Sequence, residues 1–412
     1  MNSATRLVSV IGGCLMAISA SAAWGQDWPQ WRGPNRDSKA IGFKAPATWP
    51  KELTQKWKVT VGPGDSTPAL VGDRLYVFSR EDANEVARCL DAATGKEIWQ
   101  DKYEAQGATG PASGHSGPRS SPTVVEGKVL TLGVRGTLSC LDAATGKVLW
   151  RKDDFAGSWP QYYTASSPIA VNGMCIAQLG GQQNGAVVAY ELGSGNEKWR
   201  WTGDGAAYAS PVVVSVDDAQ VVIAETDKSI VALRLTDGEL VWRTDYEVQG
   251  RGYNAATPIV DGATLVYSGS GRGAKAVKLE KKGDALAASD LWTNSENSVQ
   301  FNSPILKDGL LFGITSQDSL FCIRADSGQT AWTAELGGRG RVRGYGSIID
   351  AGPVLIALNP TAQLVVFEPT DKEFKELARY KVAESETFAH PVLAGNRIYV
   401  KDQDSVTLWT IE

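Results

Sequence analysis

One short segment is copied along the chain, and this repeat limits the possible folds more than any other feature of the sequence. The segment Cys89–Trp99 (CLDAATGKEIW) recurs almost unchanged as Cys140–Trp150 (CLDAATGKVLW). Looser copies, each with a glycine four positions before the tryptophan, end at Trp199, Trp242 and Trp332. Similarity at a fixed period indicates a fold that is assembled from one supersecondary unit.

A proline marks the start of most units. It usually follows a small or hydroxyl-bearing residue, and it occurs at Pro68, Pro122, Pro168, Pro211, Pro258, Pro304 and Pro391. The last interval is about twice as long as the others, and Gly346-Ser347-Ile348 takes the missing place without a proline. The chain therefore contains eight units of about 46 residues each.

Each unit consists of short apolar runs separated by turns that contain Gly or Asp, and four such strands per unit are typical of a β-propeller blade. Trp57–Val61 resembles a fourth strand without its first three, whereas residues 389–412 provide only three. We therefore predict an all-β, eight-bladed β-propeller of four-stranded antiparallel blades over residues 57–412. Its N-terminal strand should complete the last blade and so remove the open edge of the ring.

The repeat tryptophans share one position in the unit, so we predict that they are core residues docked between blades rather than a cofactor site. They are Trp57, Trp99, Trp150, Trp199, Trp242, Trp292 and Trp332. Cys89, Cys140 and Cys322 each lie ten positions before such a tryptophan, where other units have alanine. This pattern indicates small buried side chains, so we expect these cysteines and Cys175 to be free thiols.

Residues 1–25 have the layout of a secretory signal peptide, with Arg6 before an apolar run and small residues. We therefore expect an exported protein, periplasmic or extracellular, in which residues 26–56 form an N-terminal extension. The apolar run continues past Cys14, which differs from a lipoprotein box, so we do not expect a lipid anchor there. No later segment is long and apolar enough to predict a membrane span.

The formal net charge of −5 argues against a nucleic-acid partner, which needs clustered Lys and Arg. The two histidines of the chain also leave almost nothing for a multi-histidine metal site. His115, in the loop Gly114-His115-Ser116-Gly117, is interpreted as a loop residue because no nucleophile motif accompanies it.

The segments Asp91–Trp99 and Asp142–Trp150 resemble the tryptophan-docking repeat of the pyrroloquinoline-quinone (PQQ)-like β-propeller family. The segment Asp27–Asp37 (DWPQWRGPNRD) is similar to the mature start of secreted bacterial members. The family includes quinoprotein dehydrogenases and cofactor-free BamB-type scaffolds. The resemblance to the second kind implies a monomeric, non-catalytic scaffold in the cell envelope that binds envelope proteins or extended peptides and needs no cofactor.

The alternative is a quinoprotein oxidoreductase dependent on PQQ and Ca²⁺. Many quinoprotein alcohol dehydrogenases carry two adjacent cysteines against the quinone, and this sequence has no adjacent pair. No calcium-ligating set or catalytic aspartate of that family maps onto the chain. A carbohydrate-binding propeller is a third interpretation, because aromatic channel mouths also suit sugars.

Aromatic and arginine residues precede the innermost strands of several units, close to the position three before each proline. Because innermost strands surround the channel of a propeller, these residues should converge on one end of it. The set is Arg119, Tyr163, Tyr208, Arg251, Tyr253, Phe301, Arg341, Arg343, Tyr345 and Phe388. We predict that they rim a binding site at the channel mouth; alternatively, the rings only fill the channel.

Overall fold

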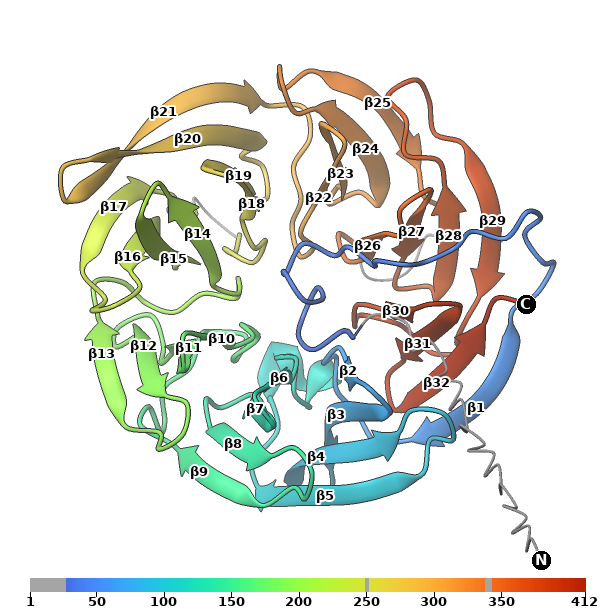
Figure 1. The fold of residues 1–412 in the computed structure, drawn as a ribbon, viewed down its shortest axis with the longest axis horizontal. Coiled ribbons are helices and arrows are strands. Elements are labelled where there is room, and N and C mark those ends of the chain that lie inside the picture. The colour runs from blue at the N-terminus through green and yellow to red at the C-terminus, as the bar shows by residue number, and fades with distance from the viewer. Residues whose placement is uncertain (1–26, 249–251, 338–342) are drawn as a thin grey trace, which may run out of the picture.

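The chain forms eight four-stranded antiparallel sheets that are arranged as blades around a central channel (Figure 1). This architecture is seen in a computed structural model, which describes residues 27–248, 252–337 and 343–412. It confirms the predicted eight-bladed β-propeller. Within the described residues the one helix is the short 3₁₀ helix η1 (Gly110–His115). The predicted signal peptide lies outside the described residues.

The first four blades each run from an inner to an outer strand in chain order. Blade 1 contains β2 (Ala69–Val71), β3 (Arg74–Glu81), β4 (Asn84–Asp91) and β5 (Glu97–Glu104). Blade 2 contains β6 (Thr123–Val125), β7 (Lys128–Leu132), β8 (Leu138–Asp142) and β9 (Val148–Lys152). Blade 3 contains β10 (Ile169–Val171), β11 (Met174–Leu179), β12 (Ala186–Glu191) and β13 (Glu197–Trp201). Blade 4 contains β14 (Val212–Val216), β15 (Ala219–Glu225), β16 (Ser229–Arg234) and β17 (Leu240–Asp245).

The other four blades complete the ring. Blade 5 contains β18 (Ile259–Asp261), β19 (Thr264–Ser268), β20 (Ala274–Lys282) and β21 (Ala285–Asn294). Blade 6 contains β22 (Ile305–Lys307), β23 (Leu310–Ile314), β24 (Ser319–Arg324) and β25 (Thr330–Glu335). Blade 7 contains β26 (Ser347–Asp350), β27 (Leu355–Leu358), β28 (Gln363–Phe367) and β29 (Glu376–Lys381). Blade 8 contains β30 (Val392–Ala394), β31 (Arg397–Lys401), β32 (Ser405–Thr410) and, from the other end of the chain, β1 (Thr54–Thr60).

Ring closure follows the prediction. Strand β1 pairs antiparallel with β32, with Thr60 opposite Ser405 and Thr54 opposite Thr410. The first described strand and the last therefore belong to one sheet, and blade 8 joins the two ends of the propeller (Figure 1).

The repeat tryptophans pack against the next blade. The indole Nε1 of Trp99 donates a hydrogen bond of 3.0 Å to the carbonyl of Ala143. Its ring covers Gly146, where a Cβ atom would lie 2.5 Å from Trp99 Cε3. The same indole-to-carbonyl bond to the following blade occurs at Trp57, Trp150, Trp199, Trp292 and Trp332. In blades 1, 2, 3, 4 and 6 a glycine provides the space that the preceding indole fills; these glycines are Gly95, Gly146, Gly195, Gly238 and Gly328.

Blade 5 departs from this pattern. In place of the short turn with glycine, β20 and β21 form a long hairpin that projects from the ring (Figure 1). Its Leu279 and Leu286 are buried and pack with the core of blade 4. Trp242 of blade 4 is half-buried, and within the described residues its indole donates no hydrogen bond. The hairpin thus replaces indole docking as the contact between blades 4 and 5.

Hydroxyl groups link the inner ends of the blades. Each Ser or Thr before a repeat proline accepts a bond from the backbone N–H of its counterpart in the preceding blade, as Ser121 Oγ does from Thr67 N at 3.0 Å. Equivalent bonds of 2.9 Å run from Ser121 to Ser167, Ser167 to Ser210, Ser210 to Thr257, Thr257 to Ser303, and His390 to Thr67. These six bonds, which we call the hydroxyl ring, explain the preference for Ser or Thr before proline.

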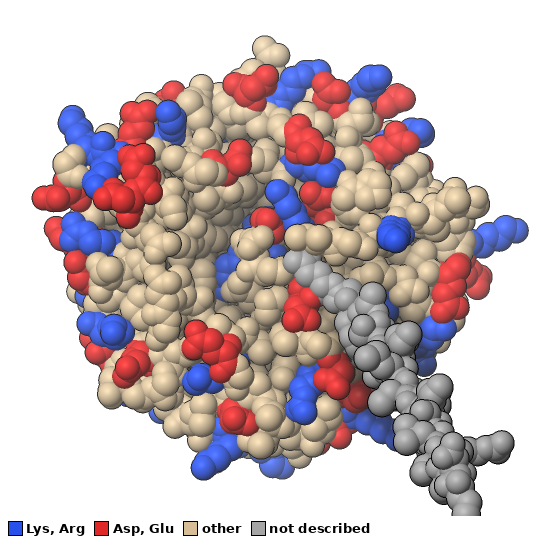
Figure 2. Space-filling view, in the orientation of Figure 1, with Lys and Arg blue, Asp and Glu red and all other residues tan. Residues whose placement is uncertain are grey.

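Cys89, Cys140, Cys175 and Cys322 are free and buried, as predicted. Lys and Arg are interspersed with Asp and Glu over the face of the propeller shown in Figure 2. In the part of the chain that the structure describes, no helix has the length and apolar character of a membrane span.

Candidate functional site

The segment of residues 27–43, which we call the N-terminal segment, enters the channel (Figure 1, blue). Trp28 forms a two-way backbone bridge with Leu70, of 2.8 and 2.9 Å, and Lys39 bridges Asp350. Leu70 is the central residue of the inner strand β2, two positions after Pro68, and Asp350 is the last residue of the inner strand β26. The segment therefore occupies the end of the channel opposite the predicted mouth.

Arg36 reaches the channel axis from this segment. Its Nη1 donates to the carbonyls of Ser167 (3.3 Å) and Pro211 (3.0 Å), and its Nη2 donates to the carbonyl of Pro168. The side chain is buried, and burial lowers the pKa of Arg36 to about 9. Backbone carbonyls of blades 3 and 4 thus hold a buried cation.

Arg32 is buried in the same way on the other side of the channel. Its Nη2 donates to the carbonyl of Pro304 (2.6 Å), and its Nε donates to Ser38 Oγ (2.7 Å). Ser38 Oγ in turn lies 3.1 Å from His390 Nε2. Burial lowers the pKa of Arg32 to about 10 and that of His390 to about 4.

A cavity of about 500 Å³ lies in the channel, and Trp31 and Arg32 of the N-terminal segment contribute to its wall. Ser and Thr residues of the hydroxyl ring line it as well. Most of the remaining wall comes from the residues that precede the inner strands: Asp65, Arg119, Tyr162, Tyr208, Tyr253, Phe301, Tyr345 and Phe388. The structure therefore brings most of the predicted mouth residues together.

The rings of this wall touch one another in a continuous series, which we call the aromatic arc. Phe301 and Tyr345 are stacked with their centroids 4.4 Å apart, and Phe388 meets Tyr345 edge-on at 5.2 Å. On the other side, Tyr253 lies 6.3 Å from Phe301 and contacts both Tyr208 and Tyr162. All six rings are half-buried and so keep part of their surface accessible.

Tyr162, not the predicted Tyr163, lines the cavity. Tyr163 has a left-handed backbone (φ 68°), and its ring stacks on Trp159 at 5.6 Å. Arg119 lines the cavity, and its Nη groups donate to the carbonyls of Tyr162 and His115. Arg343 is exposed and bonded to Gln317. The other two predicted arginines, Arg251 and Arg341, lie outside the described residues.

A histidine–carboxylate pair completes the wall. His115 Nδ1, at the end of η1, lies 2.8 Å from Asp65 Oδ2, and the bond to Asp65 raises the pKa of His115. The His115 ring meets Phe388 edge-on at 4.7 Å. The sequence alone predicts a loop position for His115 and no role for Trp31 or Arg32, whereas all three line the cavity. The sequence does place Asp65, the partner of His115, three positions before a repeat proline, where other units carry mouth residues.

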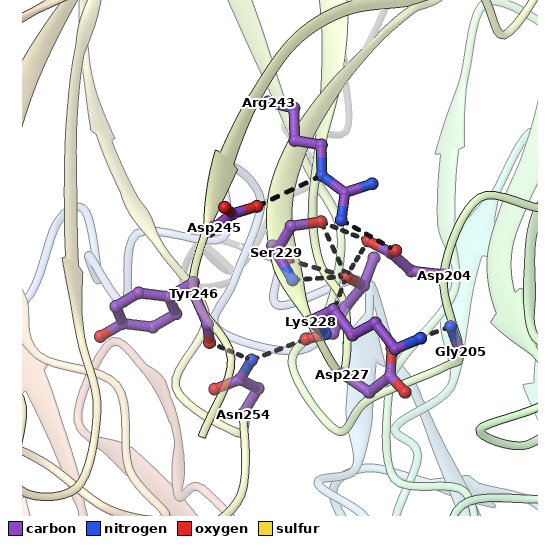
Figure 3. Close-up of polar contacts among 10 residues, drawn as sticks. Asp204, Gly205, Asp227, Lys228, Ser229, Arg243, Asp245, Tyr246 and Asn254 are labelled. Atoms are coloured by element: carbon purple, nitrogen blue, oxygen red, sulfur yellow. Dashed lines mark hydrogen bonds and ion pairs between the residues drawn. The ribbon is translucent and has the colours of Figure 1, made fainter. Parts of the chain in front are cut away.

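A buried polar network fixes the loop that carries Tyr208 (Figure 3). Asp204, whose side chain is 1% exposed, accepts a hydrogen bond from Thr226 Oγ1 (2.8 Å) and pairs with Arg243 at 3.2 Å. The Asn254 side chain donates to the Thr226 carbonyl at 2.7 Å, and the Asn254 carbonyl accepts from Tyr208 N at 3.0 Å. These contacts hold the loops before blades 4 and 5 in register, so the aromatic arc is preorganised.

The donor set of the cavity does not suit calcium. Ca²⁺ requires six to eight oxygen ligands that converge, whereas Asp65 is the one carboxylate among the described residues that line the cavity, and it is bonded to His115. Asn302 uses its amide to bind the backbone at Ile314 and Gly344. Among the described residues no group of three or more His, Cys, Asp or Glu side chains is arranged to hold a metal.

Comparisons with known proteins give relatives of two kinds. BamB, the outer membrane protein assembly factor of Burkholderia pseudomallei (strain K96243), is 25% identical over 370 residues, which cover 86% of each chain. Quinohemoprotein alcohol dehydrogenase of Comamonas testosteroni is 28% identical over 193 residues, which cover 45% of this chain but only 27% of the dehydrogenase.

Solved structures share the architecture. The quinohemoprotein alcohol dehydrogenase ADHIIG of Pseudomonas putida HK5 superposes with a TM-score of 0.69 and 16% identity, over 93% of this chain and 80% of that chain. Identity at this level shows the fold alone. The family model described as outer membrane protein assembly factor BamB matches residues 82–334, which is more than half of the chain. The chain therefore belongs to the BamB family.

Proposed function

We propose that this protein is an exported, non-catalytic scaffold that binds extended segments of cell-envelope proteins at the mouth of its channel. The aromatic arc carries the proposal, because it presents partly exposed rings around an open cavity of about 500 Å³. Tyrosine and phenylalanine rings bury a large area at a small cost in side-chain entropy, so they serve as anchors in protein interfaces.

The geometry favours a segment over a flat protein surface. The opposite end of the channel holds the N-terminal segment, so the cavity is a recess that is entered from the mouth. A recess admits a few side chains of an extended chain, with apolar side chains against the rings. This is the pocket-based form of peptide recognition.

The relatives point to the kind of partner. The BamB relative of Burkholderia pseudomallei is by name an assembly factor for outer membrane proteins, and it covers most of this chain. Transferred to this chain as part of the proposal, that name indicates envelope proteins as partners. The predicted signal peptide over residues 1–25 is consistent with export to the periplasm.

The match to quinohemoprotein dehydrogenases makes PQQ-dependent oxidation the second candidate. Its first test is addition of PQQ and Ca²⁺ to the purified protein, followed by absorbance and dye-linked oxidation of alcohols. We expect no stoichiometric binding and no turnover, because the described residues of the cavity wall provide one carboxylate, Asp65, which is bonded to His115. Stoichiometric binding with turnover would replace the scaffold proposal.

The scaffold proposal is tested by crosslinking and then by affinity. A photoreactive amino acid placed at Phe388 should capture the partner in intact cells, and mass spectrometry should identify the crosslinked segment. A synthetic peptide of that segment should bind the wild-type protein. It should bind the triple variant Tyr208→Ala, Phe301→Ala, Tyr345→Ala about 100-fold more weakly, because each lost anchor contributes about 1 kcal/mol or more.

A matched control removes a similar apolar area from the outer strands. Leu149, Leu240 and Leu291 are exposed at 43%, 39% and 48%, and none of them lines the cavity. The triple alanine variant at these positions should bind the peptide as the wild type does. Equal binding by the two triple variants would refute the channel mouth as the site.

A further inference from the structure

Blade 7 interrupts the hydroxyl ring. Ser347 takes the position that precedes a proline in the other blades, but Ile348 follows it. Its hydroxyl is buried and has no hydrogen-bond partner, and Ser347 lines the cavity. The six bonds of the hydroxyl ring do not pass through Ser347 in the part of the chain that the structure describes. The wall of the cavity therefore contains an unsatisfied hydroxyl, and a hydrogen bond to an occupant would compensate for its burial.

The Arg32 guanidinium is held by groups from the blades on both sides of blade 7. One of its edges is bonded to Pro304 of blade 6, and the other is bonded to Ser38, which contacts His390 at the start of blade 8. Blade 7, with Ser347, lies between these two blades in the ring. Within the described residues Arg32 bonds through Nε and Nη2, so its Nη1 remains free to donate.

The cavity carries excess positive charge. Among the described residues that line it, the charged groups are Arg32, Arg119, His115 and Asp65. The one carboxylate, Asp65, is paired with His115, and both arginines are bonded to neutral oxygens at the contacts described. His390 also lines the cavity, and its lowered pKa keeps it neutral near pH 7. Asp37 acts on Arg32 and Asp65 acts on Arg119 through space only, so an anion bonded in the cavity would further offset the cost of burying these cations.

We propose that Arg32 and Ser347 form a carboxylate-binding subsite on the wall of the cavity. The subsite takes a carboxylate of the bound segment, from an Asp or Glu side chain or from a chain end, while an adjacent apolar side chain packs on Phe301, Tyr345 and Phe388. This inference rests on the proposed peptide-binding function and adds a preference for acidic segments. Arg32 donates to the carboxylate through Nη1, and Ser347 donates through its hydroxyl.

Short peptides test the preference. The first pair is the blocked peptide acetyl-Ala-Phe-Glu-Phe-Ala-amide and its counterpart with Gln in place of Glu. The second pair is acetyl-Ala-Phe-Ala-Phe with a free or an amidated C-terminus. Calorimetry should show at least one carboxylate peptide binding about tenfold more tightly than its neutral partner, because a charge-assisted bond is lost in the neutral peptide. The pair that shows the preference identifies the source of the carboxylate.

Variants assign the preference to the two residues. Ser347→Ala should reduce the tenfold ratio to about threefold without lowering the melting temperature, because the hydroxyl has no partner to lose. Arg32→Gln should bring the ratio near one while the neutral peptides still bind. Ser120→Ala is the matched control, since its hydroxyl is also buried and without a partner but does not line the cavity; the ratio should not change.

The outcomes separate this inference from the function on which it rests. Equal binding of acidic and neutral peptides by the wild type would refute the carboxylate subsite and leave the scaffold proposal standing. A preference that persists unchanged in both Ser347→Ala and Arg32→Gln would also refute it. Failure of the crosslinked partner segment to bind at the mouth would refute the scaffold proposal itself.

Discussion

Replacing Trp99 with alanine measures how much one docked indole contributes to the propeller. Trp99 is only 9% exposed, it donates to the Ala143 carbonyl, and it covers Gly146. Burial of an indole removes on the order of 200 Å² from water, which is worth about 5 kcal/mol at 25 cal/mol per Å². The hydrogen bond adds about 1 kcal/mol. Because the site partly collapses and the unfolded chain is not fully exposed, we expect Trp99→Ala to lower the free energy of unfolding by about 3–5 kcal/mol.

Trp242 provides the comparison within the same protein. Its ring is half-buried, and within the described residues it donates no hydrogen bond. Trp242→Ala should therefore cost about 1–2 kcal/mol less than Trp99→Ala. Urea unfolding followed by far-UV circular dichroism gives both values. An equal decrease in the free energy of unfolding for the two variants would show that the glycine contact and the indole hydrogen bond of Trp99 add no stability.

The glycine contact, the hydroxyl ring and the two histidines can each be tested by substitution. Both Gly146 and Gly127 have a positive φ (74° and 69°), but of the two only Gly146 is covered by an indole. Gly146→Ala should therefore lower the melting temperature more than Gly127→Ala does, which thermal unfolding of the two variants measures. Ser121→Ala should lower the free energy of unfolding by about 1–3 kcal/mol, because the buried backbone N–H of Thr67 loses its acceptor. Ser121→Thr keeps a hydroxyl and should retain most of the stability. An equal loss in both variants would contradict the role of the hydroxyl ring. Burial lowers the pKa of His390 to about 4, so between pH 6.5 and about 4 this histidine is protonated in the unfolded chain but not in the folded protein. The free energy of unfolding should therefore fall by up to about 3 kcal/mol as the pH is lowered through this range. The variant His390→Gln should lack this pH dependence. His115 acts in the opposite sense: its raised pKa stabilises the fold below about pH 6.5, and this contribution is lost as the pH rises through the folded-state pKa, so His115→Gln should leave the acid slope in place.

The number of blades and the closure of the ring could be predicted from the sequence because they depend on a local, repeated pattern. Each unit carries its own strands and turns, and the count of units fixes the ring. The exception is blade 5, where the long hairpin of β20 and β21 replaces the glycine turn and Trp242 loses its usual contact. Blade 7 also lacks the glycine but still accepts a hydrogen bond from Trp332, so a missing glycine alone does not predict the change seen in blade 5.

The site was harder to predict because it depends on contacts that the repeat does not encode. Counting from the prolines identified Tyr208, Phe301 and Tyr345, which do line the cavity. It failed at Tyr163, where the left-handed backbone turns the ring away and leaves Tyr162 in its place. The role of Arg32 depends on a partner 272 residues away, and no periodicity reports such a pair.

The N-terminal segment has a consequence for the order in which the molecule folds. Arg36 binds a carbonyl 175 residues further along the chain, and Ser38 meets a side chain 352 residues further along. Both contacts require neighbouring blades that are completed much later in synthesis. Contacts of such long range form slowly, because the chain between them must first be closed into a loop. The earliest part of the described chain to be synthesised is therefore among the last to reach its final position.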